Sequence, residues 1–362
     1  MVVFNAKKLT LIVCLNVIFF AIFISCSDYS SITEATKDQV ASSNQGKVFV
    51  MYAASLLKTF ENNIGPSFQK ETGYIYEGEA RGSVQIANMI HDGIRRPDVF
   101  VSAGTIPIIK LMTNNAGINN NLSKSTHLSE WLIKFGSAEM VIAYSHASRF
   151  YSDLEKARIG EIPWYDVLSE KGFKFGRTDP ELDPKGYYMI LTAKLSNIYY
   201  NDLTIKQRIL GDDRNPNQVF PEETLKTILE QGQLDAVAAY KHEAVSRGLP
   251  YITLSPKINL ADPTFSDFYK MASYTLDSGI VIFGQPIYFS VTIPQTFKNQ
   301  DGAISFVRFL LSSKGEAILE SQGLNYIKPV IEGNIDKMPS SIKNAFEPIK
   351  QLYHSDSSIT NT

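Results

Sequence analysis

The sequence predicts an α/β protein with two lobes, each built around a mainly parallel sheet. Short apolar runs that end in small residues alternate with stretches of helical spacing, and this alternation is typical of α/β folds. It occurs once in residues 46–138 and again in residues 139–284. Of the 362 residues, 44% are hydrophobic, which is enough apolar mass for two cores.

The first lobe is predicted to open with the strand KVFVMYAAS, followed by a helix. The helix is indicated by Leu56, Phe60, Ile64 and Phe68, which fall near one face. YIYEGEARGS then predicts a short strand and turn, VQIANMIHDG a helix that ends at Gly93, and PDVFVSAG a third strand. This order suits a parallel sheet with helical connections.

The second lobe repeats the alternation with different sequences. AEMVIAYS and DAVAAY are predicted strands, and YYMILTAKLSNIYYN and PEETLKTILEQGQL are predicted helices. The strand PIYFSVTIP and the helix AISFVRFLLSSKGEAILESQG then return to the first lobe, so residues 285–345 are assigned to it and residues 346–362 to a tail. AEMVIAYS and PIYFSVTIP are the expected crossings. Ligands of α/β sheets bind beyond the carboxyl ends of strands, so we expect a ligand cleft between the lobes.

Residues 1–26 predict export from the cytoplasm. Lys7 and Lys8 precede a long uncharged apolar run that ends at Cys26. The end FISC resembles a lipobox, whose cysteine becomes the lipidated first residue of a bacterial lipoprotein. A retained membrane anchor and a plain cleaved signal are the alternatives, and all three place the folded part outside the cytoplasm. Residues 27–45 are rich in Ser, Thr, Asn and Gln, which indicates a flexible tether.

Charge, cysteine content and motifs exclude several classes of function. The formal net charge of −2 implies no nucleic-acid surface. The two cysteines, Cys14 and Cys26, both lie in the N-terminal segment, so the folded part has no disulfide, thiolate nucleophile or Cys-ligated metal. No G-x-S-x-G, HExxH or P-loop pattern occurs. The five histidines are scattered, and we expect them on the surface or in polar loops. We therefore expect no enzyme.

Two small-residue turns predict an anion site in the first lobe. Ser55 follows the first strand and Ser83 follows the second, and each is predicted to cap a helix whose N–H groups face outward. Gly82 would allow the backbone to approach a ligand closely. Because consecutive strands of one sheet end at the same edge, both hydroxyls are expected there together.

An acidic turn, RTDPELDPKGYY, stands beside this predicted anion site and admits structural roles as well. Asp183 precedes a proline and can simply start a turn. Glu222 and Glu223 open a helix and suit its dipole without any ligand. Tyr240 ends an apolar strand and can be a core residue. The pair Tyr187–Tyr188 suggests ferric coordination as a minor alternative.

Six motifs, taken in order, resemble the tungstate/molybdate-binding proteins of ABC importers. They are MYAASLL, EARGSVQIANMI, RPDVFVSAG, DPELDPKGYY, PEETLKTILEQGQLDAVAAYK and PIYFSVTIP with FVRFLLSSKGEAIL. The resemblance covers nearly all of residues 46–335 and implies the type II periplasmic binding fold, with two lobes that close on a ligand. The ligand-binding residues that it implies are Ala54, Ser55, Ser83, Asp183, Pro184, Lys185, Glu222 and Tyr240.

The resemblance also answers why carboxylates would stand in an anion site. In the archaeal branch of that family two carboxylates bond to the metal of the oxoanion, and Asp183 and Glu222 match them. Mo(VI) and W(VI) are hard centres that accept oxygen donors. Tyr240 would donate its hydroxyl to an oxygen of the anion. Two carboxylates would exclude sulfate, whose central atom accepts no such bond.

This sequence departs from the family pattern at two residues of the acidic turn. Lys185 stands where the family has cysteine, and Tyr188 stands where it has arginine. Lys185 or Arg81 can restore the lost positive charge. The pair FPEE leaves the choice between Glu222 and Glu223 open by one residue, and the eighteen-residue step to Tyr240 in the family favours Glu222.

The expected function is therefore that of an extracytoplasmic substrate-binding protein of an ABC importer. It would capture tungstate or molybdate and deliver it to a membrane permease, as a monomer without catalysis or a resident cofactor. The alternative within the same fold is a receptor for another ion, such as phosphate, thiosulfate or ferric iron.

Overall fold

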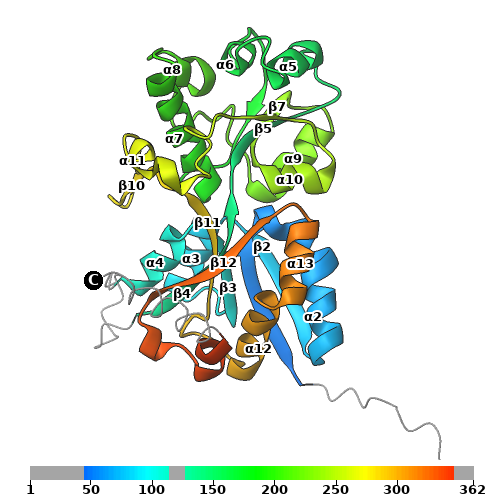
Figure 1. Ribbon diagram of the computed structural model, residues 1–362, viewed down its shortest axis with the longest axis vertical. Helices are drawn as coiled ribbons and strands as arrows, with labels where there is room; N and C mark the ends of the chain where they lie inside the picture. The colour runs from blue at the N-terminus through cyan, green and yellow to red at the C-terminus, as the bar shows by residue number, and fades with distance from the viewer. Residues whose placement is uncertain (1–44, 114–126, 346–362) are drawn as a thin grey trace, which may run out of the picture. The chain divides into compact units, whose positions relative to one another are not determined.

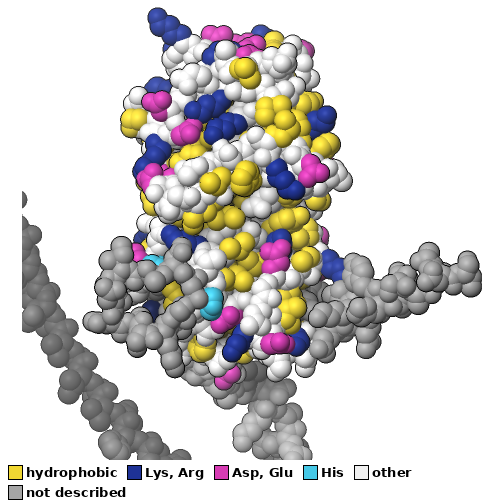
Figure 2. Space-filling model, turned by 90° about the vertical axis from the view of Figure 1, so that its left-hand side faces the viewer, with side chains coloured by type: hydrophobic (Ala, Val, Ile, Leu, Met, Phe, Trp, Pro, Cys, Tyr) yellow, Lys and Arg dark blue, Asp and Glu magenta, His cyan; other side chains and the backbone are white. Residues whose placement is uncertain are grey.

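The computed structural model describes residues 45–113 and 127–345 (Figure 1). The predicted signal segment, all but the last residue of the tether and the tail at residues 346–362 lie outside this part of the chain. Within the described residues, no helix is both long and apolar enough to cross a membrane. On the face drawn in Figure 2, Lys and Arg side chains are interspersed with acidic and apolar ones.

The larger sheet has six strands in the order β12-β4-β11-β3-β1-β2. They are β1 (Lys47–Ala53), β2 (Ile75–Arg81), β3 (Val99–Ala103), β4 (Trp131–Ala138), β11 (Ile287–Thr292) and β12 (Asn325–Gly333). β1 pairs in parallel with β2 and β3, whereas β11 is antiparallel to β3 and β4, and β12 is antiparallel to β4. β11 runs against its neighbours because it brings the chain back from the second lobe (Figure 1).

The smaller sheet has four strands in the order β6-β7-β5-β8. They are β5 (Met140–Tyr144), β6 (Phe175–Gly176), β7 (Ala236–Tyr240) and β8 (Tyr251–Thr253). β6 and β7 are parallel, and β5 is antiparallel to both β7 and β8. The prediction of mainly parallel sheets is thus wrong for both lobes. In each sheet the strand that enters from the other lobe, β11 or β5, is antiparallel to its neighbours.

Helices cover the sheets on both faces. In the first lobe they are η1 (Ala54–Leu56), α1 (Leu57–Thr59), the π-helical η2 (Phe60–Ile64), α2 (Gly65–Thr72), α3 (Ser83–His91), α4 (Ile106–Met112), α12 (Gln300–Leu310), α13 (Ser313–Ser321) and η4 (Ile335–Lys337). The first four form one helical run, as the apolar spacing after the first strand predicts.

The second lobe has further short helices and a two-stranded sheet. They are α5 (Tyr151–Arg158), α6 (Trp164–Leu168), α7 (Pro184–Tyr199), α8 (Ile205–Leu210), α9 (Glu222–Glu230), α10 (Lys241–Arg247), η3 (Pro263–Phe265), α11 (Ser266–Tyr269), β9 (Ser273–Thr275) and β10 (Val281–Phe283). The helix α7 carries the longest buried surface, because its residues from Pro184 to Ala193 are all buried.

Alternation along β1 explains why this strand reads as a continuous apolar run. Val50 and Tyr52 face the main core, where Phe60 stacks on Tyr52 at 4.7 Å between ring centroids. Met51 faces the opposite side and packs in a separate cluster with Ile86 and Phe100. Both faces of the strand are therefore buried, as in α/β sheets covered by helices on two sides.

The chain crosses to the second lobe through β4 and β5, which are internal strands of their sheets, and it returns to β11 from the two-stranded sheet of β9 and β10. β4 ends at Ala138 and β5 begins at Met140, so Glu139 alone separates them. The return passes from Phe283 at the end of β10 to Ile287 at the start of β11. The sequence predicted β5 and β11 as crossings, but β4 and β12 were not predicted as strands. The lobe boundaries drawn at 138/139 and 284/285 stay predictions.

Candidate functional site

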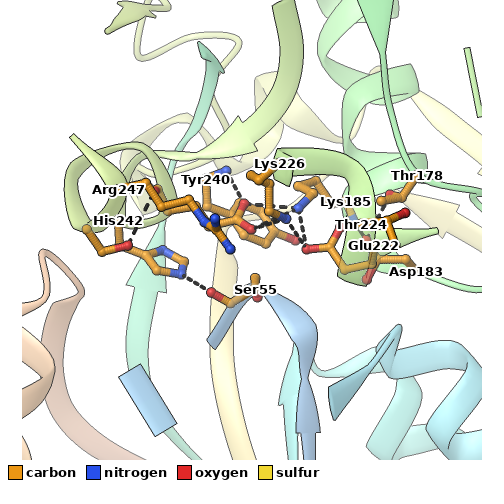
Figure 3. Close-up of polar contacts among 12 residues, drawn as sticks. Ser55, Thr178, Asp183, Lys185, Glu222, Thr224, Lys226, Tyr240, His242 and Arg247 are labelled. Atoms are coloured by element: carbon orange, nitrogen blue, oxygen red, sulfur yellow. Dashed lines mark hydrogen bonds and ion pairs between the residues drawn. The ribbon is translucent and has the colours of Figure 1, made fainter. Parts of the chain in front are cut away.

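The carboxyl ends of strands from both sheets face each other between the lobes. β1, β2 and β3 run toward the second lobe, and β6 and β7 run toward the first (Figure 1). Figure 3 shows Ser55 of the first lobe facing Tyr240, Glu222 and Asp183 of the second. These side chains meet where the sequence predicted a ligand cleft, and the cleft itself stays a prediction.

The first lobe contributes two serines, but neither caps a helix in the way predicted. Ser55 lies inside η1, whose cap is Ala53, and its buried Oγ has no hydrogen-bond partner among the described residues. Ser83 is the first residue of α3, whose cap is Gly82, and its Oγ accepts a 3.0 Å hydrogen bond from the amide of Ala103. The N-cap prediction is wrong because each helix begins one residue or more earlier than expected.

The acidic turn of the second lobe places Asp183 as the cap of α7. Its Oδ1 accepts hydrogen bonds of 2.9 Å from the amide of Lys185 and of 2.9 Å from Thr178 Oγ1. A Cβ on Gly186 would lie 2.6 Å from Thr178 O, so glycine is required for this tight turn. Burial raises the pKa of Asp183, and the ammonium of Lys185 opposes that shift. The helix-capping role of Asp183 coexists with its position in the site.

Four buried charged side chains form a cluster next to Asp183: Lys185, Lys226, Glu222 and Glu243. We call these four residues the buried charge cluster. The Nζ of Lys185 donates to Glu222 Oε1 at 2.6 Å and to Glu243 Oε2 at 3.0 Å. The Nζ of Lys226 lies 2.6 Å from the same Glu222 Oε1 and 2.5 Å from Glu243 Oε1. Both ammonium groups therefore share both carboxylates, and two opposite pairs of charges cancel.

Burial and charge act against each other on the pKa values of the cluster. Burial raises the pKa of Glu222, and the ammonium groups of Lys185 and Lys226 oppose that shift and favour the ionised form. For Glu243 the two lysines outweigh burial and hold the pKa below its usual range. Burial alone would lower the pKa of Lys185, but Glu222 and Glu243 raise it above its ordinary value. Lys185 is therefore a permanently charged group inside the protein.

Several polar groups between the lobes are buried without a hydrogen-bond partner in the described part of the chain. They are Ser55 Oγ, Tyr240 Oη and Glu222 Oε2. The buried hydroxyls of Tyr187 and Tyr188 interact weakly with each other and, for Tyr188, with Gln285, and neither has a hydrogen bond of normal geometry. Burial holds the pKa of each of these three tyrosines above its ordinary value, so the phenols are neutral hydrogen-bond donors. Buried polar groups are normally paired, and a cluster of unpaired ones indicates a polar ligand.

The sequence analysis named Tyr187 and Tyr188 only as a minor alternative for ferric coordination, and not among the residues expected to bind an oxoanion. Both lie in the first turns of α7, and a Cβ on Gly104 of the first lobe would lie 2.9 Å from Tyr188 Oη and 3.5 Å from Tyr187 Oη. Their hydroxyls therefore reach the end of β3. The signal was present, since the pair follows directly on the Asp183 turn within one of the six motifs.

The lobes touch each other around this region. The amide of Gln85 donates a 2.9 Å hydrogen bond to the carbonyl of Leu182, and Lys58 Nζ donates to the carbonyl of Ser246. Arg81 lies 3.6 Å from Glu223, which points away from the buried charge cluster. The structure thus places Glu222, and not Glu223, beside Lys185 and Asp183.

One histidine lies in this region, contrary to the surface or loop position expected from the sequence. His242 is 3% exposed, and its Nε2 lies 3.3 Å from the carbonyl oxygen of Ser55 in the opposite lobe. Its ring packs edge-on against Phe289 at 5.2 Å. Burial lowers the pKa of His242 to about 4. The imidazole is therefore neutral at pH 7 and links the two lobes as a hydrogen-bond donor.

The other expected site residues lie at the starts of two helices. Ala54 opens η1 next to Ser55, and Pro184 opens α7 next to Asp183. Two surface cavities of about 470 and 490 Å³ lie elsewhere in the second lobe, and neither is lined by any of these residues. Among the described residues, no three side chains of His, Cys, Asp or Glu gather as a metal cage.

Two lobes that close on buried hydrogen-bond donors define a solute-binding protein. The model of the family described as bacterial extracellular solute-binding protein matches residues 48–325, and the chain belongs to this family.

Individual relatives and solved structures agree with this assignment. An uncharacterized solute-binding protein of Petrotoga mobilis is 33% identical over 306 residues, which are 83% of this chain and 89% of that protein. The molybdate/tungstate-binding protein WtpA of Pyrococcus abyssi is 29% identical over 327 residues, covering 83% and 90% of the two chains. The periplasmic molybdate-binding protein of Azotobacter vinelandii superposes with a TM-score of 0.51 at 18% identity, covering 78% of this chain and 100% of that one. The fold is the two-lobe type II periplasmic binding protein fold that the sequence predicted.

Proposed function

We propose that this protein is the substrate-binding component of an ABC importer and that it captures tungstate or molybdate outside the cytoplasm. The unpaired groups between the lobes carry this proposal. Ser55 and Tyr240 offer hydroxyl hydrogens that have no acceptor within the described residues, and Tyr187 and Tyr188 add two buried hydroxyls without a hydrogen bond of normal geometry. An oxoanion supplies several acceptor oxygens at once, and charged acceptors make the stronger hydrogen bonds.

The unpaired oxygen of Glu222 favours an oxoanion whose central atom can accept a carboxylate oxygen. Glu222 Oε2 is buried and unpaired, while Oε1 is held by two ammonium groups. An ionised carboxylate can only accept, so its partner must be a proton donor or an electron-poor atom. The metal of tungstate or molybdate is such an atom, and Asp183 and Glu222 are proposed to bond to it. Relatives named as molybdate/tungstate-binding proteins support this choice.

The remaining residues take roles around the same anion. Ser55, Tyr187, Tyr188 and Tyr240 would donate hydroxyl hydrogens to its oxygens, and the backbone of Ala54 and Ser83 would add further donors. Pro184 fixes the start of α7, and Lys185 compensates carboxylate charge. Closure of the lobes removes water, which strengthens each of these hydrogen bonds. No resident cofactor and no catalytic step are required.

Titration calorimetry of the ligand-free protein with tungstate, molybdate, phosphate and sulfate tests the proposal. We expect tungstate and molybdate to bind most tightly. Metal analysis of protein purified from medium with tungstate, molybdate, iron and phosphate should find tungsten or molybdenum bound. Phosphate or sulfate binding more tightly than both metal oxoanions would contradict the proposed ligand.

Ferric iron is the second candidate, because three tyrosine hydroxyls stand together in the site. Iron coordination would require the phenols to ionise, and burial raises the pKa of all three. Titration with ferric citrate separates the two functions. A visible phenolate-to-iron absorption band would favour iron, and we expect none.

We further propose that the chain is a monomeric lipoprotein anchored through Cys26 and that it delivers its ligand to the permease of the same importer. Membership in an extracellular solute-binding family supports the location outside the cytoplasm. The lipobox-like sequence supports the anchor.

A further inference from the structure

Lys185 is a fully buried cation in the wall of the proposed anion site. Its side chain is 0% exposed, and its ammonium contacts Glu222 at 2.6 Å and Glu243 at 3.0 Å. The same ammonium lies 5.3 Å from the centre of the Tyr240 ring. Lys185 therefore touches the carboxylate proposed to bond the metal and a tyrosine proposed to bind an oxygen.

Lys185 limits the net negative charge around the site. Lys185 and Lys226 carry two positive charges, and Glu222 and Glu243 carry two negative charges in contact with them. Asp183 adds one further buried carboxylate beside them. These five side chains carry one net negative charge, and without Lys185 they would present two net negative charges to an incoming dianion.

We propose that Lys185 determines the range of oxoanions that the closed site accepts. By compensating carboxylate charge, it admits dianions whose central atom cannot accept a carboxylate oxygen, such as sulfate, in addition to tungstate and molybdate. This inference rests on the proposed function of the site. It replaces the expectation from the sequence that paired carboxylates exclude sulfate.

The two kinds of anion should respond differently to the loss of this charge. Sulfate contacts the protein through its oxygens alone, so the repulsion from Asp183 and Glu222 acts on it in full. Tungstate offers its metal to Glu222 Oε2, which converts part of that repulsion into a bond. Charge interactions are large in a buried site of low dielectric constant. Removal of Lys185 should therefore weaken sulfate binding much more than tungstate binding.

The test is titration calorimetry of Lys185→Met with sodium tungstate and sodium sulfate, at one fixed ionic strength because salt screens charges. For the wild-type protein we expect measurable sulfate binding that is weaker than tungstate binding. For Lys185→Met we expect the ratio of tungstate to sulfate affinity to rise by at least about tenfold. Lys206→Met is the matched control, because Lys206 pairs with Asp213 away from the site and its loss should leave the ratio unchanged.

A charge-matched variant separates electrostatics from packing. Lys185→Met/Glu243→Gln removes one positive and one negative charge, so the net charge of the wall returns to that of the wild type. The glutamine oxygen can still accept the amide hydrogen of Tyr240, which Glu243 Oε2 accepts at 2.8 Å. We expect this variant to recover a wild-type ratio within about threefold. It also keeps the test valid if Lys185→Met does not fold.

Each other outcome has a definite meaning. An unchanged ratio in Lys185→Met overturns the inference, as does a double variant that binds tungstate but no sulfate. Wild-type protein that binds tungstate and no sulfate also overturns it, while the proposed function stands. Wild-type protein that binds neither tungstate nor molybdate overturns the proposed function itself.

Discussion

The backbone amide of Gln85 donates a 2.9 Å hydrogen bond across the interface between the lobes to the carbonyl of Leu182. Gly82 lies beside this contact, and a Cβ at Gly82 would come within 2.4 Å of the same carbonyl oxygen. The φ of Gly82 is −58°, which any residue can adopt. Glycine is therefore needed at this position for the approach of the lobes and not for the local backbone.

Gly82→Ala should weaken ligand binding without unfolding the protein. The added methyl group collides with Leu182 only when the lobes are closed, and such overpacking costs about 1–3 kcal/mol, or about tenfold in affinity. Calorimetry with tungstate measures the loss, and the melting temperature of the ligand-free protein should stay within a few degrees of the wild type. Full affinity in this variant would mean that the two lobes close without this contact.

Tyr240→Phe should lower tungstate affinity by about tenfold, because a hydrogen bond to a charged acceptor contributes about 1.5–3 kcal/mol. The unfolding free energy of the ligand-free protein should not fall, since the Tyr240 hydroxyl has no partner there. Tyr269→Phe is the control, because the hydroxyl of Tyr269 donates to the carbonyl of Pro256 away from the site. That variant should lose stability and keep its affinity, and the reverse pattern would exclude Tyr240 from the site.

Asp183→Asn distinguishes the charge of Asp183 from its capping role. Asparagine can still accept the hydrogen bonds from the amide of Lys185 and from Thr178, so α7 should keep its start. Tungstate affinity should nevertheless fall by at least about tenfold if the carboxylate bonds to the metal. Asp183→Ala should lose about 1 kcal/mol of stability in addition. If the Asp183→Asn variant binds tungstate as tightly as the wild-type protein does, Asp183 only caps the helix.

His242 should make stability depend on pH on the acid side. Its pKa falls from 6.5 to about 4 on folding, so between these values the unfolded chain binds more protons than the folded one. The stabilisation is therefore complete above about pH 6.5 and is lost as the pH falls toward 4, by up to about 3 kcal/mol. Denaturant unfolding from pH 4 to 7 measures the slope. His242→Phe keeps the ring packing and should remove this component, and an identical slope in both proteins would refute it.

Cys26→Ser should release the protein from membranes. The wild-type chain, expressed in full in a bacterial host, is expected to partition into the detergent phase and to incorporate labelled fatty acid. The variant should do neither, because serine has no thiol to carry the lipid. Detergent partition of both proteins would instead indicate a retained apolar segment as the anchor.

The alternation of strands and helices predicted the fold class, and small-residue turns indicated where the site lies. The strand directions were not predictable, because β4 and β12 were missed and hydrophobic pattern does not report direction. The pairing of β12 with β4 changes register between Tyr326 and Val330. Such an irregular strand shows no regular alternation of apolar and polar residues in the sequence.

The sequence predicted which residues lie near one another in the candidate site, but not the ion pairs between them. Glu222, Asp183 and Tyr240 lie together as expected, but the ion pair of Lys185 with Glu243 joins residues that no local pattern relates. In the sequence, Glu243 is typical of an acidic residue in the first turn of a helix, here α10, and nothing indicates a buried ion pair. His242 and the pair Tyr187–Tyr188 are buried by contacts from the opposite lobe, which a sequence does not encode at short range.

The chain leaves the first lobe through β4 and β5, which are each hydrogen-bonded on both sides, and it returns to β11 from β10, which pairs with β9. Rotation of one lobe against the other would therefore be absorbed at Glu139 and between Phe283 and Ile287. If each half rotates as a rigid block, its outer surface is the same with and without bound ligand. A transport partner that contacts one half alone could not then distinguish the ligand-bound protein from the ligand-free one. A partner that bridges the rim near Lys58 and Ser246 would detect a rotation of the lobes directly, because these two residues come from opposite lobes and are in contact here.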